Sequence, residues 1–536
     1  MKKIASGLLL LTFIIAFSKV NAQSPAPIPP QVATPDKVET PLGTMQFKDG
    51  MPSDATATKA YDHIDAVHAE DAFYSAFAAV NMWAIRKGFL AAGINDNDVI
   101  LFSALMDAKS LFLTANADTV YFWTFVDLSK GPVIVEPPPD SLAIIDDMWW
   151  RYITDMGVPG PDRGTGGRYL LVPPGYKGPL PDGGYFVNKS RTNRVTILGR
   201  CFLENNDPKP AADRIKAQFK IYPYAPGSFG TSIADFLTGK AKLGQLANPE
   251  APRFVEGTGK VMNTIPPNDY SFYEFLNETV QDEPASALDP EVAGSFASIG
   301  IVKDKPFNPD ARMRKILTDS VATANAVSRV ITFHPRAEEG FAYYDPSSHW
   351  LNTLYVGGYN FMAAPPHITR EGLEPAPEDG ARKLNSRIAM FYVATGITPA
   401  MVMYLPNIGS AYLGAFFDSK GAPLDGAKSY KVDLPKGIPA AKFWSLTLYD
   451  NQTRSMLDTP QRFPRAGSQS YPSPAAVANE DGSTTIYFGP KAPEGRSSNW
   501  IQTTPGKGWF VLLRLYSPLP PFFDKSWRPG ELEEVK

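Results

Sequence analysis

The sequence predicts a mainly β protein with helical insertions, in which two antiparallel β-sandwich (jelly-roll-like) domains are joined by a helical connector. Prolines (51) and glycines (42) are frequent among the 536 residues, which indicates many turns. Aromatic residues make up 12% of the chain, and short segments with strand alternation gather toward both of its ends. A chain of this length buries large cores and is expected to hold at least two domains.

The N-terminus predicts a cleaved signal peptide over residues 1–22. Lys2 and Lys3 precede an apolar run from Ile4 to Phe17, which is shorter than the ~18 residues that a membrane helix needs. Val20-Asn21-Ala22 then supplies the small residues of a signal-peptidase site, so cleavage is expected after Ala22. We therefore expect a periplasmic or secreted protein that keeps no membrane anchor after cleavage.

Charge and cysteine content exclude some partners and some bonds. Removal of residues 1–22 takes away three lysines, which leaves 49 basic residues against 55 acidic ones. The sequence has no stripe of Lys and Arg, so nucleic acid is not the expected partner. Cys201 is the only cysteine, so no disulfide can form within the chain and packing must hold the fold.

Residues 23–56 are rich in Pro, Ala and Thr and predict a linker or an extended arm. An N-terminal β-sandwich domain is expected over 57–209. It begins with a helix over about 59–92, one face of which carries Phe73, Phe77 and Val80. The strands of this domain are predicted at 119–125, 132–136, 168–172 and 194–198.

A helical connector is expected over 210–395 and a C-terminal β-sandwich domain over 396–536. The helices of the connector are predicted near 210–219, 269–281, 310–331 and 380–394. The strands of the C-terminal domain are predicted at 412–417, 430–434, 443–449, 484–488 and 509–516. In the last strand, alternation puts Trp509 and Val511 on one face and Phe510 and Arg514 on the other.

Both halves of the chain carry long, distinctive motifs. The N-terminal half carries Asn116-Ala117-Asp118-Thr119-Val120-Tyr121, Gly166-Gly167-Arg168-Tyr169-Leu170-Leu171-Val172 and Leu198-Gly199-Arg200. The C-terminal half carries the segment from Phe443 to Asp450, Asn499-Trp500 and Leu513-Arg514-Leu515-Tyr516. In this order the motifs resemble a bacterial family that pairs domain of unknown function 1254 with domain of unknown function 1214. The resemblance implies an exported protein with two β-sandwich domains and is compatible with a homo-oligomer, but it implies no particular reaction.

Polar and aromatic residues at the start of the 119–125 strand form the first candidate site. Asn116 and Asp118 could bind a metal ion or a polyol hydroxyl, and together with Tyr121 they are the candidate catalytic residues. Trp123 shares a face with Tyr121 and would stack on a ring of the substrate. The alternative is that the Asn and Asp side chains cap a turn by bonding to the backbone.

Two arginines are candidates for binding a substrate anion. Arg168 ends the glycine-rich loop 162–168, which matches neither a P-loop nor a dinucleotide fingerprint and has a plain hairpin loop as its alternative. Arg514 lies in the last strand, where an unpaired buried charge is costly. We expect it either to pair with a carboxylate such as Asp450 or Glu494, or to clamp a substrate carboxylate.

Residues of the 443–449 strand complete the candidate site. Trp444, Tyr449 and Asp450 would line a shared rim that binds sugars or aromatic rings, and the alternative is that the aromatic side chains are core or interface residues. The densest group of metal-ligating residue types runs from His334 to His349, although its spacing matches no established pattern. A divalent metal ion is therefore a candidate cofactor with no assigned ligands.

These residues lead to three hypotheses about function. The first is a hydrolytic enzyme that acts on a small or carbohydrate-like molecule at a site between the sandwiches. The common serine-hydrolase signatures are absent, and Cys201 is expected to be buried rather than nucleophilic. The second hypothesis is a non-catalytic protein that binds such a molecule. The third is a structural or assembly protein of the cell envelope, in which the aromatic residues form subunit interfaces.

Overall fold

The computed structural model describes residues 28–225, 237–238, 249–362, 367–368, 373–374, 380–402 and 405–535. The chain divides into two compact units, of which the first ends at Ile64 and the second begins at Asp65. The predicted signal peptide lies outside the described residues, so export stays a prediction, as does the homo-oligomer. Within the described ranges, no helix is both long enough and apolar enough to cross a bilayer.

The first unit contains a small antiparallel sheet inside the predicted arm. Its strands are β1 (Lys37–Thr40), β2 (Gly43–Lys48) and β3 (Met51–Pro52), paired in the order β1-β2-β3. The hydroxyl of Thr40 accepts from the N–H of Leu42 and donates to the carbonyl of Gly43, whose φ of 90° suits a glycine at this turn. Sequence analysis did not predict these strands, because the Pro-, Ala- and Thr-rich composition of residues 23–56 indicated a linker or an extended arm.

In the second unit, the N-terminal sandwich consists of a six-stranded and a four-stranded sheet. Their strand orders are β14-β4-β6-β12-β8-β9 and β11-β10-β7-β13. The strands are β4 (Val99–Phe102), β6 (Val120–Asp127), β7 (Val133–Glu136), β8 (Leu142–Asp147), β9 (Tyr152–Gly157), β10 (Tyr169–Val172), β11 (Phe186–Lys189), β12 (Arg194–Cys201), β13 (Lys220–Pro223) and β14 (Phe254–Glu256). Phe122, Ile197 and Leu171 belong to one core that both sheets share with helix α2 (Lys209–Gln218), so the sheets pack face to face.

The C-terminal sandwich pairs a five-stranded sheet, β16-β19-β25-β21-β22, with a four-stranded sheet, β24-β23-β20-β26. The strands are β16 (Trp350–Leu351), β19 (Ser410–Ala415), β20 (Ser429–Leu434), β21 (Ala440–Asp450), β22 (Arg465–Gly467), β23 (Thr484–Gly489), β24 (Trp500–Gln502), β25 (Trp509–Pro518) and β26 (Glu533–Val535). Trp509, Val511 and Leu513 pack between the two sheets, which confirms the predicted alternation of this strand. In the four large sheets most ladders are antiparallel, and the parallel pairs β10–β11, β4–β14 and β23–β24 lie at sheet edges.

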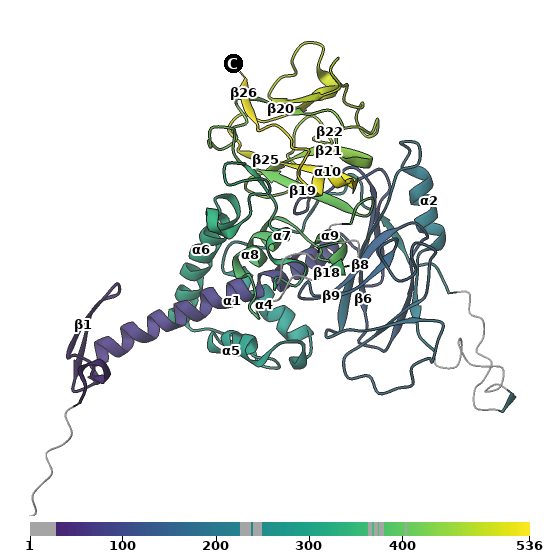
Figure 1. Ribbon diagram of the computed structural model, residues 1–536. Coiled ribbons are helices and arrows are strands. Elements are labelled where there is room, and N and C mark those ends of the chain that lie inside the picture. The colour runs from purple at the N-terminus through teal and green to yellow at the C-terminus, as the bar shows by residue number, and fades with distance from the viewer. Residues whose placement is uncertain are drawn as a thin grey trace, which may run out of the picture. The chain divides into compact units, whose positions relative to one another are not determined.

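Helix α1 (Asp54–Ala91) begins in the first unit, and its later part forms the centre of a helical layer in the second (Figure 1). Every residue from Ala76 to Ile85 is buried, and a helix that is buried on all sides needs neighbours all round. Those neighbours include α4 (Ser271–Asp282), α6 (Ala311–Phe333), α8 (Leu384–Val393) and strand β6. The remaining elements are α5 (Pro290–Ser298), α7 (Leu354–Gly357), α9 (Pro399–Val402), α10 (Pro520–Phe523), β5 (Ser110–Leu111), β15 (Met262–Asn263), β17 (His367–Ile368), β18 (Leu373–Glu374), η1 (Pro30–Val32), η2 (Ala285–Ala287), η3 (Ala337–Glu339) and η4 (Ser497–Asn499).

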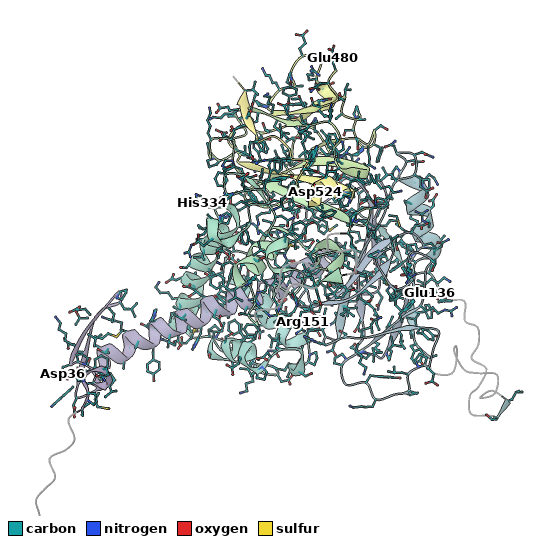
Figure 2. All side chains as sticks on the ribbon, viewed as in Figure 1. Asp36, Glu136, Arg151, His334, Glu480 and Asp524 are labelled. Carbon is teal, nitrogen blue, oxygen red and sulfur yellow. The ribbon has the colours of Figure 1, made fainter. Side chains whose placement is uncertain are left out.

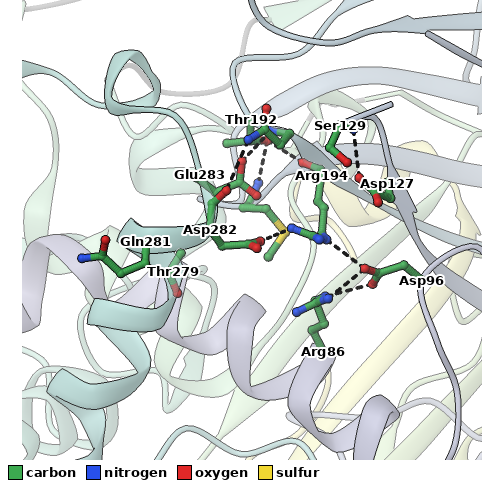
Figure 3. A network of polar contacts seen from close by, with 12 residues as sticks. Arg86, Asp96, Asp127, Ser129, Thr192, Arg194, Thr279, Gln281, Asp282 and Glu283 are labelled. Carbon is green, nitrogen blue, oxygen red and sulfur yellow. Dashed lines mark hydrogen bonds and ion pairs between the residues drawn. The ribbon is translucent and has the colours of Figure 1, made fainter. Parts of the chain in front are cut away.

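A network of charged side chains ties α1 and α4 to strand β12 (Figure 3). Arg86 of α1 binds Asp96 through Nε at 2.9 Å and Nη2 at 2.8 Å. Asp96 also accepts from Nε of Arg194 at 2.8 Å, and Arg194 donates in turn to Asp282 at the end of α4. Because these side chains are largely shielded from water, the pairs hold the helices to the sheet more firmly than exposed pairs would.

The predicted helices and strands agree with the structure to within a few residues, and the chain is mainly β with helical insertions. Sequence analysis missed β8 and β9, because buried acidic residues such as Asp146 and Asp155 interrupt their apolar pattern. Helix α2 and strand β13 fall at the start of the predicted connector, but both pack with the N-terminal sandwich.

Glu283 follows α4 and carries a buried carboxyl group. One of its oxygens accepts from the backbone N–H of Asn193, and the other has no hydrogen-bond partner in the part of the chain that the structure describes. Burial raises the pKa of Glu283 to about 8, despite the opposing effect of the bond from Asn193. A carboxyl group with a raised pKa in the folded state makes its full contribution to the free energy of unfolding below its unfolded-state pKa. This contribution is lost as the pH rises toward 8.

We expect Glu283→Gln to flatten this pH dependence. From about pH 5 to about pH 9, the free energy of unfolding of the native protein should fall by about 2–4 kcal/mol more than that of the variant. The variant should therefore melt at a higher temperature than the native protein at the upper pH, as measured by circular dichroism. Glu274→Gln, at an exposed position of α4, is the control. Parallel pH curves for Glu283→Gln and the native protein would contradict the prediction.

Candidate functional site

A cavity of about 220 Å³ lies between the two sandwiches of the second unit. One wall is a face of the six-stranded sheet, a second comes from β19 and β25, and α8 with the segment 394–402 forms a third. In Figure 1 these elements meet around α7, α8 and α9. Much of the wall is apolar, with side chains such as Met106, Leu198, Met390 and Leu512, so its few polar groups mark where a ligand would be recognised.

The first wall depends on the register of three neighbouring strands. Tyr121 of β6, Arg200 of β12 and Leu142 of β8 form one row, and residues paired across antiparallel strands point to the same face. All three line the cavity. Gly199 turns to the opposite face, where an added Cβ would lie 2.1 Å from the ring of Phe122. The next row on the cavity face consists of Trp123, Leu198, Ile144 and Asp155.

The second wall comes from the C-terminal sandwich. Tyr412 of β19 pairs with Arg514 of β25, and Gly414 pairs with Leu512. These four residues line the cavity together with Ser410. The polar residues of the two walls thus face each other across the boundary between the sandwiches.

Arg200 reaches the cavity without a carboxylate partner. Its Nη1 donates to the hydroxyl of Tyr121 at 3.0 Å and of Tyr412 at 3.5 Å, and its Nη2 donates to Ser410 at 3.0 Å. No described carboxylate forms an ion pair with it. Burial alone lowers the pKa of Arg200, but the neighbouring tyrosines raise it well above its ordinary value, so the guanidinium stays charged. Neutral hydroxyls balance such a charge only in part.

Arg514 is the second guanidinium in the wall, and its side chain is only 2% exposed. Its Nη2 donates to the carbonyl oxygens of Thr114 at 2.9 Å and Ala115 at 3.3 Å, whereas its Nε and Nη1 have no hydrogen-bond partner among the described residues. The ion pair expected with Asp450 is not formed, because Asp450 binds Lys507 at 2.5 Å. Arg514 therefore forms no direct ion pair with a described carboxylate, although burial is opposed by nearby tyrosines and by the charge of Asp118, which together raise its pKa above the ordinary value.

Tyr412 stands beside both guanidinium groups. Its hydroxyl lies 3.5 Å from Nη1 of Arg200, and the centre of its ring lies 5.9 Å from Cζ of Arg514. Burial raises the pKa of Tyr412, but the charges of the two arginines outweigh burial and bring this pKa below its ordinary value. This part of the cavity is consequently positive enough to favour an anion.

Asp155 is the only carboxyl group among the described residues of the wall. Its Oδ1 accepts from Thr398 at 2.6 Å and its Oδ2 from the hydroxyl of Tyr152 at 3.2 Å. Burial raises the pKa of Asp155 to about 6, against the lowering effect of these two bonds. Thr398 belongs to the segment 394–402, whose backbone also donates to Asp146 at 3.0 Å. Two buried carboxyl groups thus hold this side of the cavity in place.

A buried ion pair joins the two sandwiches close to Arg514. Nε of Arg465 lies 2.7 Å from Oδ1 of Asp118, and both side chains are fully buried. The other oxygen of Asp118 accepts from Ser445 at 2.6 Å and from Tyr516 at 2.9 Å. Asn116 donates to the hydroxyl of Tyr516 and accepts from the N–H of Asp118 at 2.7 Å. The loop before β6 is thereby fixed on β21, β22 and β25.

Four of the predicted site residues line the cavity, namely Asn116, Tyr121, Trp123 and Arg514. Their proposed roles stay predictions. Asp118 is not part of the lining, and among the described residues its carboxylate contacts the side chains of Arg465, Ser445 and Tyr516 and no backbone group. The predicted capping contact is made by Asn116, whose side chain accepts from the N–H of Asp118. Tyr449 is also fully buried, and its hydroxyl donates to the carbonyl of Ala115 at 2.6 Å.

The predicted rim of Trp444, Tyr449 and Asp450 is not formed. Trp444 packs in the core between the sheets of the C-terminal sandwich, whereas Tyr449 packs against the helical layer. The physical reason is strand alternation, which sends side chains an odd number of residues apart to opposite faces. Arg168 lies outside the cavity, with its Nε 3.6 Å from Glu136, which Figure 2 labels.

The candidate metal cluster between His334 and His349 is not assembled. Nδ1 of His349 lies 3.3 Å from Glu531, and Arg528 binds both Glu531 at 3.1 Å and Asp345 at 2.5 Å, so a guanidinium group pairs with both carboxylates. Throughout the described ranges, no group of three or more His, Cys, Asp and Glu side chains is placed to hold a metal ion. We therefore assign no ligand set to the candidate divalent ion.

Sequence reasoning missed Arg200, Tyr412, Ser410 and Arg465. Arg200 stood in the Leu198-Gly199-Arg200 motif, but only the strand register shows that it lies across from Tyr121. Arg465 gave no signal, because β22 is only three residues long and its partner comes from the other sandwich.

Two family models match the chain. "Protein of unknown function (DUF1254)" matches residues 97–223, and "Protein of unknown function (DUF1214)" matches residues 409–520. The chain carries both domains of this pair. DUF1254 runs from β4 to β13 and DUF1214 from β19 through the whole of β25, so each domain supplies one sheet wall of the cavity. No curated protein matches the chain.

Two solved structures are similar to the chain. The VPA0106 protein from Vibrio parahaemolyticus is 18% identical, with a TM-score of 0.49, and the match covers 88% of this chain and 100% of that one. An uncharacterized protein from Burkholderia cenocepacia is 14% identical, with a TM-score of 0.37, and the match covers 90% of this chain and 97% of that one.

Arg465→Met should strongly destabilise the protein. The substitution leaves Asp118 buried without its counter-charge, which should lower the free energy of unfolding by about 3–5 kcal/mol. The double variant Asp118→Asn, Arg465→Met should recover part of this loss, because neither charge remains. Urea unfolding of the single and double variants measures the coupling between the two residues.

The control for this prediction is Asp213→Asn, which removes one partner of the exposed Lys209–Asp213 pair. It should change the free energy of unfolding by no more than about 1 kcal/mol. If Arg465→Met cost no more than the control, the buried pair would not join the sandwiches in the way described.

Proposed function

We propose that the protein binds a small molecule with an anionic head group and an apolar body in the cavity between the two domains. The observation that carries the proposal is that Arg200 and Arg514 both line a largely apolar cavity, beside Tyr412, and that neither forms a direct ion pair with a carboxylate among the described residues. A buried guanidinium without a counter-ion is costly. A carboxylate or a similar oxyanion on a ligand would supply the missing charge and accept several N–H bonds.

The hydroxyl groups around Arg200 hold its guanidinium in a fixed orientation for binding an anionic head group. Tyr121, Tyr412 and Ser410 orient the guanidinium through two of its nitrogens. An arginine has five N–H donors, so donors remain for an anion in the cavity. Apolar side chains such as Leu198 then cover the body of the ligand, and each Å² of apolar surface buried contributes roughly 25 cal/mol.

The residues that line the cavity favour binding over the hydrolytic and the assembly hypotheses. Acid–base hydrolysis of a glycoside uses a pair of carboxyl groups, and Asp155 is the only carboxyl group in the described wall. For the assembly hypothesis, Trp444 belongs to the core of its own sandwich and is not a surface for a partner. We further propose, on the basis of the predicted signal peptide, that binding takes place outside the cytoplasm.

Isothermal titration calorimetry with straight-chain alkyl carboxylates, from hexanoate to decanoate, tests the proposal. Each carboxylate is compared with the alcohol of the same chain length, so that the two probes differ in the charged head group alone. Binding of the carboxylates that is stronger than binding of the alcohols is expected. Equal or weaker binding of the carboxylates would overturn the proposal.

Arg200→Met should weaken binding of the carboxylates by about 10- to 100-fold, because the charge-assisted hydrogen bonds are lost, and should leave binding of the alcohols unchanged. Arg200 is a better site for this test than Arg514, whose Nη2 also holds the backbone carbonyls of Thr114 and Ala115. Arg168→Met removes an arginine outside the cavity and is the matched control. Undiminished carboxylate binding by Arg200→Met would count against the proposed site.

A further inference from the structure

We infer that the ligand carries a protonated amine at the end opposite its anionic group, and that Asp155 binds this amine. The inference rests on the proposed function, because it concerns the same cavity and the same ligand. It names the ligand class more closely, as an elongated molecule with an anion at one end, a cation at the other and an apolar chain between them.

The sheet register fixes the separation of the two charged ends. Arg200 and Leu198 are neighbours on the cavity face of β12, and the row of Leu198 continues through Ile144 to Asp155. Asp155 is thus two strands away from Arg200 across the sheet and two residues away along it. With strands about 4.8 Å apart and a rise of about 3.3 Å per residue, the two Cα atoms are about 12 Å apart. At this distance the two side chains do not neutralise each other directly, but one small ligand can reach both.

Asp155 matches Arg200 in having no partner of opposite charge. Its side chain is 5% exposed, and the described residues that bond to it, Thr398 and Tyr152, donate neutral O–H groups. A carboxylate has about four lone-pair sites, so it can accept further donors from the cavity. A charged donor such as an ammonium group binds a buried carboxylate more strongly than a neutral donor does.

The surface between the two charged residues is apolar. Leu198 and Ile144 lie in the row of Asp155, and Leu142 lies in the row of Arg200, all on the cavity face. This strip would contact a methylene chain and would not hydrogen-bond to a sugar. The wall therefore presents a positive end, an apolar middle and a negative end to the ligand.

The competing explanation is that Asp155 only holds Thr398 and with it the segment 394–402. The two explanations differ in what Asp155→Asn should do. An asparagine keeps an oxygen that can accept from Thr398 but removes the negative charge. Loss of a structural contact would affect all ligands alike, whereas loss of the charge would affect only ligands with an amine.

Calorimetric titration with octanoate and with ω-amino-octanoate separates these explanations. The native protein should bind ω-amino-octanoate more tightly than octanoate. Asp155→Asn should weaken binding of ω-amino-octanoate by about 30-fold or more, because a buried ammonium loses its partner, and should change binding of octanoate by less than about 3-fold. Thr398→Val keeps the carboxylate and should keep the preference for the amine.

Three outcomes overturn the inference while the proposed function stands. In the first, Asp155→Asn loses the same factor of affinity for both probes. In the second, the native protein binds octanoate but not ω-amino-octanoate. In the third, Thr398→Val no longer prefers ω-amino-octanoate over octanoate. If neither probe binds, or if Arg200→Met binds octanoate as the native protein does, the proposed function fails and the inference fails with it.

Discussion

The buried ion pair between Asp118 and Arg465 is the constraint on which the relation of the two sandwiches depends. A buried carboxylate is costly unless it is paired and hydrogen-bonded, so the loop before β6 must lie where Arg465 pairs with Asp118 and where Ser445 and Tyr516 can donate to it. In that position the loop also offers the carbonyls of Thr114 and Ala115 to Arg514. The contact that joins the domains thereby orients one of the charged groups of the cavity.

The cavity belongs to the pair of domains and to neither one alone. DUF1254 contributes Tyr121, Arg200 and Asp155 from its six-stranded sheet, and DUF1214 contributes Tyr412 and Arg514 from β19 and β25. Each sheet uses one face for its own sandwich core and the other for the cavity or the helices. A ligand bound in this cavity would therefore be recognised by residues far apart in the sequence, and small shifts between the domains would change the site.

Local patterns in the sequence predicted local structure well. Alternation assigned both faces of β25. The spacing of Phe73, Phe77 and Val80 correctly predicted a helix with these residues buried, although it did not show that residues 76–85 are buried on all sides. Asn116, Tyr121, Trp123 and Arg514 were found because they stand in strand motifs with mixed polar and aromatic residues. Arg200 and Arg465 were not, because their importance comes from pairing between distant strands, which no local pattern encodes. Trp444 was predicted at the rim of a site, but the alternation of its strand directs its side chain into the core of the C-terminal sandwich.

The burial of Cys201 has a practical consequence for spectroscopy. The thiol is fully covered, and burial raises its pKa to about 11, so the reactive thiolate is scarce at neutral pH. Since the sequence has no other cysteine, thiol-directed dyes and spin labels should find no native target in the folded protein. Cysteines could then be introduced at the exposed positions Asp182 and Glu480, one in each sandwich. The distance between labels on these two cysteines would report on the angle between the domains when a candidate ligand is added.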